Sequence, residues 1–307
     1  MQQLTVRQME VIRAVSLHGS VTDAAAALGI SQPAVSLMLR ECAAHAGFPF
    51  FVRKRGRLQS TRETQELLTE LNRIFDGIER VNRLVGDMRE TTAGTVHIAT
   101  LPTLAENLVA PTSVEFRKAW PQIQISVTTS SDNLSAAEAV AQERADLGIL
   151  LSPTRHEAER LRGARVIDLC TVDMVCLVHP DSPLAGRQAV TPADLEPYPL
   201  ISFDRSLPLG ELLEGSYRKA GVARRTAIGI TFTSVAYSLT RSGAGVAIID
   251  PFYVRTRHDP DVVVLRFEPR TRVKAQLLLP SNTALPRAAQ LFVAALRKTA
   301  SAVRQGT

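Results

Sequence analysis

Residues 20–38 read SVTDAAAALGISQPAVSLM, and their pattern predicts the structure of the N-terminal part of the chain. Thr22 is a suitable N-cap for a short alanine-rich helix over residues 23–28, and Gly29 suits the left-handed turn that follows. Ser31 then caps another helix, with Pro33 in its first turn, where a missing amide hydrogen costs nothing. Two short helices joined by a glycine turn predict a helix-turn-helix, with an ordinary helical hairpin as the alternative.

A helix precedes this unit and a basic segment follows it. Residues 6–17 carry a broad apolar face, and Gly19 ends that helix. Residues 48–58 contain four cations and no acid; the cations are Arg53, Lys54, Arg55 and Arg57. The net charge of +6 only permits an acidic partner. A basic patch on so small a domain indicates contacts with nucleic-acid phosphates, whereas a solvated loop is the alternative.

The pattern over the first 65 residues resembles the signature of the LysR-type transcriptional regulators. The resemblance rests on Ala24-Ala25, Leu28-Gly29 and residues 31–36, and continues through Glu41, Gly47, Phe51, Arg53, Arg57 and Thr61. The sequence departs from the pattern at Leu37-Met38, over residues 42–45, and at Thr64, where a glycine is common. The resemblance implies a winged helix-turn-helix over residues 1–60, double-stranded DNA as partner, and assembly beyond dimers to tetramers.

The start of the third helix supplies the candidates for reading base edges. If this helix enters the major groove, Gln32 and Ser36 reach the bases, Ser31 holds a phosphate, and Arg40 reaches backbone or base. The basic segment grips phosphates, which gives affinity without sequence information. The candidate DNA-binding residues are Ser31, Gln32, Pro33, Ser36, Arg40, Arg53, Lys54, Arg55 and Arg57.

Residues 61–92 form a linker helix with a heptad seam. Its apolar positions alternate by four and three: Leu67, Leu71, Ile74, Ile78, Val81, Val85 and Met88. This regularity predicts a homodimer paired along the helix, although a single amphipathic helix packed on its own domain has the same pattern. A two-fold dimer reads an interrupted inverted repeat.

From Gly94 the chain alternates strands and helices, which predicts α/β architecture. Strands are expected at 95–100, 123–128, 145–149, 172–178, 201–203, 227–232 and 245–249, with a last strand at 274–279. Helices are expected at 103–118, 134–144, 210–220, 234–241 and, opened by a proline, at 286–302. Two such sets in tandem resemble the periplasmic-binding-protein-like regulatory domain of the same family, here residues 93–307. That resemblance implies lobe 1 over 93–168 and 271–307 and lobe 2 over 169–270, with crossings near Leu169 and Arg270.

Ligands of open α/β sheets bind beyond the carboxyl ends of strands, and hydroxyl groups gather there in this sequence. The candidate effector-binding residues are Thr100, Leu101, Pro102, Thr103, Thr129, Ser130, Ser202, Phe203, Thr231, Thr233 and Ser234. Such hydroxyls at helix starts suit a small polar or anionic molecule, but they also serve as N-caps. Residues 243–252 resemble regulators that sense lysine or opine-like amino acids, which implies an amino-acid-like carboxylate effector.

No catalytic or metal-binding motif is recognised, so an enzyme is not expected, nor are a cofactor and a metal. Three scattered cysteines exclude a disulfide framework, and a redox role for Cys170 and Cys176 is left open. Apolar runs are too short to cross a bilayer, so a cytoplasmic protein is expected. Three interpretations stay open: a ligand-responsive regulator, for which RNA polymerase is a candidate partner; a DNA-binding protein whose α/β domain only assembles it; and an α/β solute-binding or catalytic protein.

Overall fold

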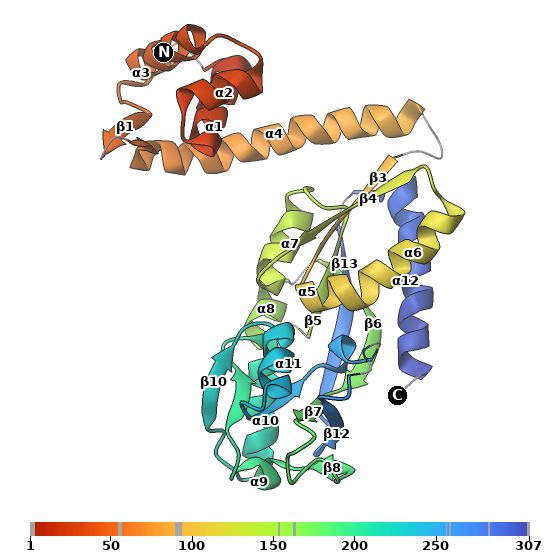
Figure 1. The fold of residues 1–307 in the computed structure, drawn as a ribbon. Coiled ribbons are helices and arrows are strands. Elements are labelled where there is room, and N and C mark those ends of the chain that lie inside the picture. The colour runs from red at the N-terminus through yellow and green to blue at the C-terminus, as the bar shows by residue number, and fades with distance from the viewer. Residues whose placement is uncertain are drawn as a thin grey trace. The chain divides into compact units, whose positions relative to one another are not determined.

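The computed structural model describes residues 4–54, 57–89, 94–152, 154–161, 164–255, 257, 259–281 and 283–305. It divides into two compact units, Met1–Asn82 and Arg83–Thr307, each of which is described by itself (Figure 1).

The N-terminal unit is a three-helix domain with a two-stranded wing. It consists of α1 (Val6–His18), α2 (Val21–Leu28), α3 (Gln32–Ala46), the antiparallel strands β1 (Phe51–Lys54) and β2 (Arg57–Ser60), and the first part of α4 (Arg62–Arg89). Ser31 caps α3 as predicted, and Gly29 has a φ of 65°, the left-handed conformation that the turn requires. The predicted cap of α2 is wrong, because the Ser20 hydroxyl, and not that of Thr22, accepts a hydrogen bond from the Asp23 amide.

Two apolar clusters hold the N-terminal unit together. Ala25 is 3% exposed between the helices of the first cluster, so a larger side chain there forces α1 and α2 apart. The other members of this cluster are Val11, Val15, Ala24 and Val35. The second cluster joins α1, α3 and the wing to α4 through Ile12, Cys42, Phe50 and Leu71, with Leu67 packed against them.

The heptad seam of α4 therefore serves two purposes. Leu71 is 1% exposed and belongs to the core of the DNA-binding domain itself, and Leu67 packs beside it. Farther along the helix the seam residues are exposed: Ile74, Ile78, Val81 and Val85. The Met88 side chain lies outside the described residues. Four consecutive seam positions thus present apolar side chains to solvent on the described part of α4.

Lobe 1 of the C-terminal unit is a five-stranded sheet with the order β4-β3-β5-β13-β6. Its strands are β3 (Gly94–Thr100), β4 (Ile123–Thr129), β5 (Leu147–Leu151), β6 (Arg165–Asp173) and β13 (Arg272–Leu279). Its helices are α5 (Pro102–Leu104), η1 (Ala105–Val109), α6 (Ala110–Ala119), α7 (Asn133–Ala141), α8 (Arg155–Arg160) and α12 (Arg287–Gln305), with α6 and α12 on one side of the sheet and α7 on the other (Figure 1). The helix expected at 103–118 is interrupted by a π-helical turn, since Pro111 has no amide hydrogen to continue the α-helical pattern.

Lobe 2 is a six-stranded mixed sheet with the order β10-β9-β11-β7-β12-β8. Its strands are β7 (Val175–Val178), β8 (Ala189–Val190), β9 (Leu200–Phe203), β10 (Thr226–Ile230), β11 (Val246–Ile249) and β12 (Val263–Phe267). Its helices are α9 (Pro192–Leu195), α10 (Pro208–Lys219), α11 (Thr233–Arg241) and η2 (Pro251–Tyr253). Strand β12, which the sequence analysis did not anticipate, pairs antiparallel with β7.

The chain crosses between the lobes twice, and the first crossing lies later than predicted. Strand β6 stays in lobe 1 as far as Asp173, which pairs with Arg272 of β13. The crossing is therefore at Met174 and not near Leu169, because one long strand fills the sheet edge before the chain leaves it. The predicted strand at 172–178 is in fact the end of β6 and the whole of β7, in two different sheets. The return passes through Arg270, between β12 and β13.

Candidate functional site

The start of α3 presents a polar, exposed edge. Gln32 is exposed, and its amide donates a hydrogen bond of 2.9 Å to the hydroxyl of the half-buried Ser36, one turn on. Arg40 is exposed a further turn along the same face. The Ser31 hydroxyl accepts from the Ala34 amide at 3.4 Å, and Pro33 is exposed beside it. Side chains of positions 32, 36 and 40 follow one line along the helix, as a recognition helix requires.

Two cations of the wing have no carboxylate partner among the described residues. Arg53 and Lys54 are exposed at the end of β1, and neither forms an ion pair with a described residue. In the antiparallel register Lys54 lies opposite Arg57, which places those two cationic positions side by side. Arg55 and the side chain of Arg57 lie outside the described residues. Unpaired surface cations of this kind are free to contact phosphates.

A cavity lies between the two lobes of the C-terminal unit, with about 610 Å³ of space that includes open solvent. Lobe 1 contributes Leu101, Pro102, Thr103, Glu106, Ser131, Asp132 and Leu151. Lobe 2 contributes Phe203, Leu207, Pro208, Leu209, Thr231, Phe232, Thr233, Ser234 and Tyr253. Among these described residues there is no lysine or arginine, and the two charged side chains are carboxylates.

Seven of the eleven candidate effector-binding residues line this cavity: Leu101, Pro102, Thr103, Phe203, Thr231, Thr233 and Ser234. The other four do not line it. The buried Thr100 donates its hydroxyl to the carbonyl of Ile149, and Ser202 accepts a hydrogen bond from Arg224. Thr129 ends strand β4 and Ser130 follows it, and the next two residues, Ser131 and Asp132, line the cavity instead.

Two of the lining hydroxyls share one buried carboxylate. The Thr103 hydroxyl of lobe 1 donates to one oxygen of Asp250 at 3.1 Å, and the Thr233 hydroxyl of lobe 2 donates to the other at 2.7 Å. These two hydroxyls are therefore not N-caps, because the N-cap positions are Leu101 and Phe232. Asp250 is fully buried, and burial raises the pKa of its carboxyl. Asp250 lies within residues 243–252 but is not among the candidate effector-binding residues, although a carboxylate directly after the apolar strand β11 is a usable signal.

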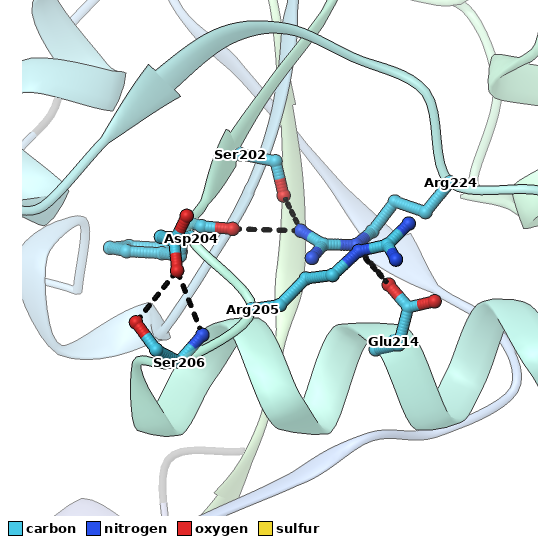
Figure 2. Close-up of polar contacts among 7 residues, drawn as sticks. Ser202, Asp204, Arg205, Ser206, Glu214 and Arg224 are labelled. Atoms are coloured by element: carbon cyan, nitrogen blue, oxygen red, sulfur yellow. Dashed lines mark hydrogen bonds and ion pairs between the residues drawn. The ribbon is translucent and has the colours of Figure 1, made fainter.

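A buried arginine holds the strand end that forms another wall of the cavity. Figure 2 shows the Arg224 guanidinium between β9 and α10, where it donates to the Ser202 hydroxyl at 2.6 Å. It also donates to the carbonyl of Phe203 at 2.8 Å and pairs with Glu214 at 2.9 Å. The Arg224 side chain is 1% exposed, so its charge is fully committed to these partners. The network fixes Phe203, which lines the cavity.

The loop between β9 and α10 approaches the helix so closely that only glycine fits. A Cβ at Gly210 would stand 1.7 Å from the carbonyl oxygen of Asp204. The Asp204 carboxylate accepts from the hydroxyl and amide of Ser206, and these hydrogen bonds lower the pKa of Asp204 (Figure 2). Arg205 adds a second cation at 3.2 Å from Glu214. The first turn of α10 is therefore held against the cavity by packing as well as by charge.

A further contact joins the lobes at Tyr253. Arg257 of lobe 2 pairs with Glu106 of lobe 1 at 3.3 Å, and its guanidinium stacks 3.7 Å above the ring of Tyr253. Glu106 and Tyr253 both line the cavity. This contact and the Asp250 bridge connect the η2 region of lobe 2 to the start of lobe 1.

The cavity can hold a molecule with charges of both signs. Helices α10 and α11 begin at it, and their N-cap residues, Leu207 and Phe232, supply no side-chain hydrogen bond. First-turn N–H groups and the helix dipole favour a negative group there. On the lobe 1 side, Asp132 favours a positive group, whereas the charge of Glu106 is already paired with Arg257. Burial raises the pKa of Asp132, but hydrogen bonds from the Ser135 amide and from two serine hydroxyls outweigh this and keep the carboxyl ionised.

Cys170 and Cys176 form no disulfide with each other. Cys170 lies on β6 of lobe 1 and Cys176 on β7 of lobe 2, and both are buried thiols. Burial raises the pKa of Cys176 to about 12, so the reactive thiolate is suppressed at neutral pH. The described residues contain no cluster of three His, Cys, Asp or Glu side chains arranged to hold a metal, and no helix among them is long and apolar enough to cross a membrane.

Known proteins match both parts of the chain. A family model described as LysR substrate binding domain matches residues 89–301, and one described as bacterial regulatory helix-turn-helix protein, lysR family, matches residues 6–65. The transcriptional activator protein LysR of Escherichia coli (strain K12) is 28% identical over 280 residues, which cover 91% of this chain and 88% of that protein. The octopine catabolism/uptake operon regulatory protein OccR of Rhizobium meliloti is 28% identical over 248 residues, covering 81% and 80%. Full-length CbnR solved with its target DNA has the same fold, with a TM-score of 0.78 at 20% identity over 96% of this chain and 100% of that one.

A winged helix-turn-helix, a long linker helix and a two-lobed α/β domain with an inter-lobe cavity define a DNA-binding transcription regulator and not an enzyme. The chain belongs to the LysR family, which confirms the resemblance drawn from its first 65 residues. The predicted fold class is confirmed as well.

Proposed function

We propose that this regulator binds an interrupted inverted repeat on DNA as a homodimer. We further propose that a small amino-acid-like carboxylate binds in the inter-lobe cavity and changes the geometry of the DNA complex. Gln32, Ser36 and Arg40 read the site, and the wing cations hold its phosphates. The exposed apolar seam of α4, Ile74, Ile78, Val81 and Val85, pairs the two copies, and the dimers assemble further into tetramers.

The observation that carries the effector proposal is the pair of uncommitted hydroxyls at the start of α11. Thr231 and Ser234 line the cavity, and neither hydroxyl has a hydrogen-bond partner among the described residues. They lie beside the N-terminus of a nine-residue helix that lacks a side-chain cap. Hydroxyls and free backbone N–H groups together suit a carboxylate.

The negative charge on the opposite wall of the cavity favours an effector that also carries a positive group. Asp132 places a negative charge in a lining without lysine or arginine among the described residues, and the second carboxylate there, Glu106, is paired with Arg257. A simple dicarboxylate would meet Asp132 unfavourably, whereas an amino acid or opine-like molecule presents an ammonium to it. Apolar side chains from both lobes, such as Leu151 and Phe203, then contact the aliphatic part.

Effector binding shifts the equilibrium between lobe arrangements and does not create DNA binding. The ligand contacts both lobes, so it stabilises the arrangement in which they are closest. In a dimer this alters the geometry of the two recognition helices and hence DNA bending. A regulator placed upstream in this way contacts RNA polymerase, and it acts in the cytoplasm, where the DNA is.

A thermal-shift screen tests the effector proposal. We expect cationic and neutral amino acids to raise Tm, and their decarboxylated amines and uncharged analogues to have no effect. Thr231→Val should abolish the shift, whereas Thr226→Val, an exposed threonine on neighbouring β10, should leave it intact. Stabilisation by uncharged, non-carboxylate compounds alone would contradict the proposal.

Footprinting on the DNA upstream of neighbouring genes tests the rest. We expect two protected half-sites at moderate salt and a change in their protection when the effector is added. A footprint that never responds to the effector leaves the α/β domain with an assembly role only. No protection would contradict the proposed site reading.

A further inference from the structure

We call the proposed ligand site between the lobes the effector cavity. The C-terminal unit has a second hollow, which differs from the effector cavity in the charge of its lining. It encloses about 1060 Å³ of space, part of it open solvent, and lies between α10 of lobe 2 and the edge of lobe 1. Lobe 1 contributes Ser152, Thr154, Arg155 and Arg272; the return crossing contributes Arg270 and Thr271; and α10 contributes Pro208, Glu211, Leu212, Gly215, Ser216, Arg218 and Lys219. We call this hollow the basic cleft.

Cations dominate the lining of the basic cleft. Five of its side chains are cationic and one, Glu211, is a carboxylate. Arg270 has a carboxylate partner, Asp173, at 3.8 Å. The other four, Arg155, Arg218, Lys219 and Arg272, form no ion pair with a described residue, and all four are exposed.

Structural roles account for three of the five cations, one of which is Arg270 with its partner Asp173. Arg218 and Lys219 lie in the last turn of α10, where positive charge complements the helix dipole. Arg155, Arg270 and Arg272 come from three other places in the chain, namely the start of α8, the return crossing and the start of β13. Like charges brought together by separate elements repel one another, so the arrangement is stabilised when a counter-anion is present.

We infer that the basic cleft is a second ligand site, which binds a small polyanion carrying at least two phosphate or carboxylate groups. Arginine forks hold such groups with paired hydrogen bonds, and cations on both lobes and on the crossing require a ligand with separated charges. The base of the cleft is ordered for this purpose, because Ser216 and Thr271 are buried and their hydroxyls bond at 2.6 Å between α10 and the crossing.

The basic cleft and the effector cavity are connected through α10. Pro208 lines both hollows, and the residues next to it, Leu207 and Leu209, line the effector cavity. An anion that draws Arg218 toward Arg272 therefore acts on the same helix whose first turn borders the effector. Binding at the two sites is coupled, and by linkage each ligand changes the affinity for the other by the same factor.

Titration calorimetry with inorganic triphosphate on the full chain, without DNA or effector, tests this inference. We expect one binding event per chain, weakened at least about tenfold by the double variant Arg218→Ala/Arg272→Ala, since two arginines that donate charge-assisted hydrogen bonds are removed. Arg297→Ala, an exposed arginine on α12 away from the cleft, should bind as the unsubstituted chain does. Equal Tm values for these proteins verify that the variants are folded.

Two further experiments test which kind of anion binds and where on the protein it binds. Citrate tests carboxylates against phosphates, and tight binding of either at the cleft supports the inference. The variant Arg53→Ala/Lys54→Ala removes wing cations and should retain triphosphate binding. If that variant loses binding while the cleft variant keeps it, the anion occupies the DNA-binding surface and the inference is wrong. Absence of binding up to about 10 mM triphosphate also overturns it, and neither result touches the effector screen.

Discussion

The DNA-binding unit and the effector cavity differ in the groups that would bind a negatively charged partner. In the N-terminal unit, Arg40, Arg53 and Lys54 are exposed on flexible side chains without carboxylate partners among the described residues. In the cavity, no lysine or arginine is found among the described lining residues, and helix ends and hydroxyls take their place. We expect a polyanion to be held by side chains that salt can screen, and the proposed zwitterion by helix ends and side chains in a partly enclosed cavity. DNA binding should therefore weaken steeply with salt, and effector binding should not.

Separating the two copies of the DNA-binding unit should have the largest effect on DNA affinity. Ile78→Asp/Val81→Asp places two carboxylates in the exposed seam of α4 and should leave a monomer. Affinity for a two-half-site DNA should then fall by about 10²–10⁴, since the second half-site is no longer bound within one complex. Sedimentation and mobility-shift titrations measure both effects. Asn82→Asp, a new carboxylate at an exposed position of the same helix, is the control; a double variant that remains dimeric would show that the seam does not pair.

Removing wing cations tests the salt argument directly. Arg53→Ala/Lys54→Ala should weaken binding to specific and random DNA alike. The slope of log affinity against log salt should become shallower by about 0.9 for each phosphate that is no longer neutralised. Effector-induced thermal shifts should not change. An unaltered slope would mean that these two cations do not contact phosphates.

A smaller effect, confined to single base pairs, is expected at the start of α3. Gln32→Ala should reduce discrimination at one position by about 1–3 kcal/mol while leaving affinity for random DNA unchanged. Ser36→Ala should act at the same or the adjacent pair, because Ser36 accepts a hydrogen bond from Gln32. Competition binding with a library of single base changes measures this, with the exposed Gln65→Ala as control. Equal losses on all sequences would assign these residues to the phosphate backbone instead.

A structural feature of this protein is predictable from sequence when the residues that determine it lie close together in the chain. The helix-turn-helix rests on caps and a glycine within one short stretch, and it was recognised from sequence, although Ser20 and Thr22 both suit a cap and only the structure separates them. The heptad pattern identified the apolar positions of α4 but not their partners, since periodicity does not say that Leu71 packs on its own domain.

The cavity was only partly predictable, because its residues meet through the tertiary fold. Of the residues predicted at strand ends, Thr103, Thr231 and Ser234 line the cavity, whereas Thr100 and Ser202, in equivalent places, bond to Ile149 and Arg224. The Asp250 bridge depends on two threonines, one from each lobe, which no local pattern connects. The lobe crossing was misplaced because a continuous apolar run does not show where one sheet ends and the next begins.

The Asp250 bridge should also affect how the stability of the protein depends on pH. We expect this effect to be smaller than those on DNA binding. Burial raises the pKa of Asp250, so the folded chain holds this proton to higher pH than the unfolded chain does. The contribution to stability is thus fully present below the ordinary carboxyl pKa and is lost as pH rises through the raised value. In Asp250→Asn this loss is absent.

Urea unfolding at a series of pH values from about 4 upward, the ordinary carboxyl range, measures the difference. The unfolding free energy of the unsubstituted chain should fall with rising pH relative to that of Asp250→Asn. Asp181→Asn, at a carboxylate whose side chain is 91% exposed, should follow the unsubstituted chain. Identical pH profiles for the Asp250 variant and the unsubstituted chain would exclude the bridge as a titrating element.

The order of strands in lobe 1 has a consequence for the synthesis of this protein. Strand β13 lies between β5 and β6, and β6 pairs with β13 and with no other described strand. On the ribosome, the DNA-binding unit and the whole of lobe 2 emerge before β13 is made. Until then β5 and β6 both have an unsatisfied edge, the state in which strands pair with a neighbouring chain. We therefore expect the nascent chain to be most prone to aggregation just before β13 appears, and a product truncated there to aggregate.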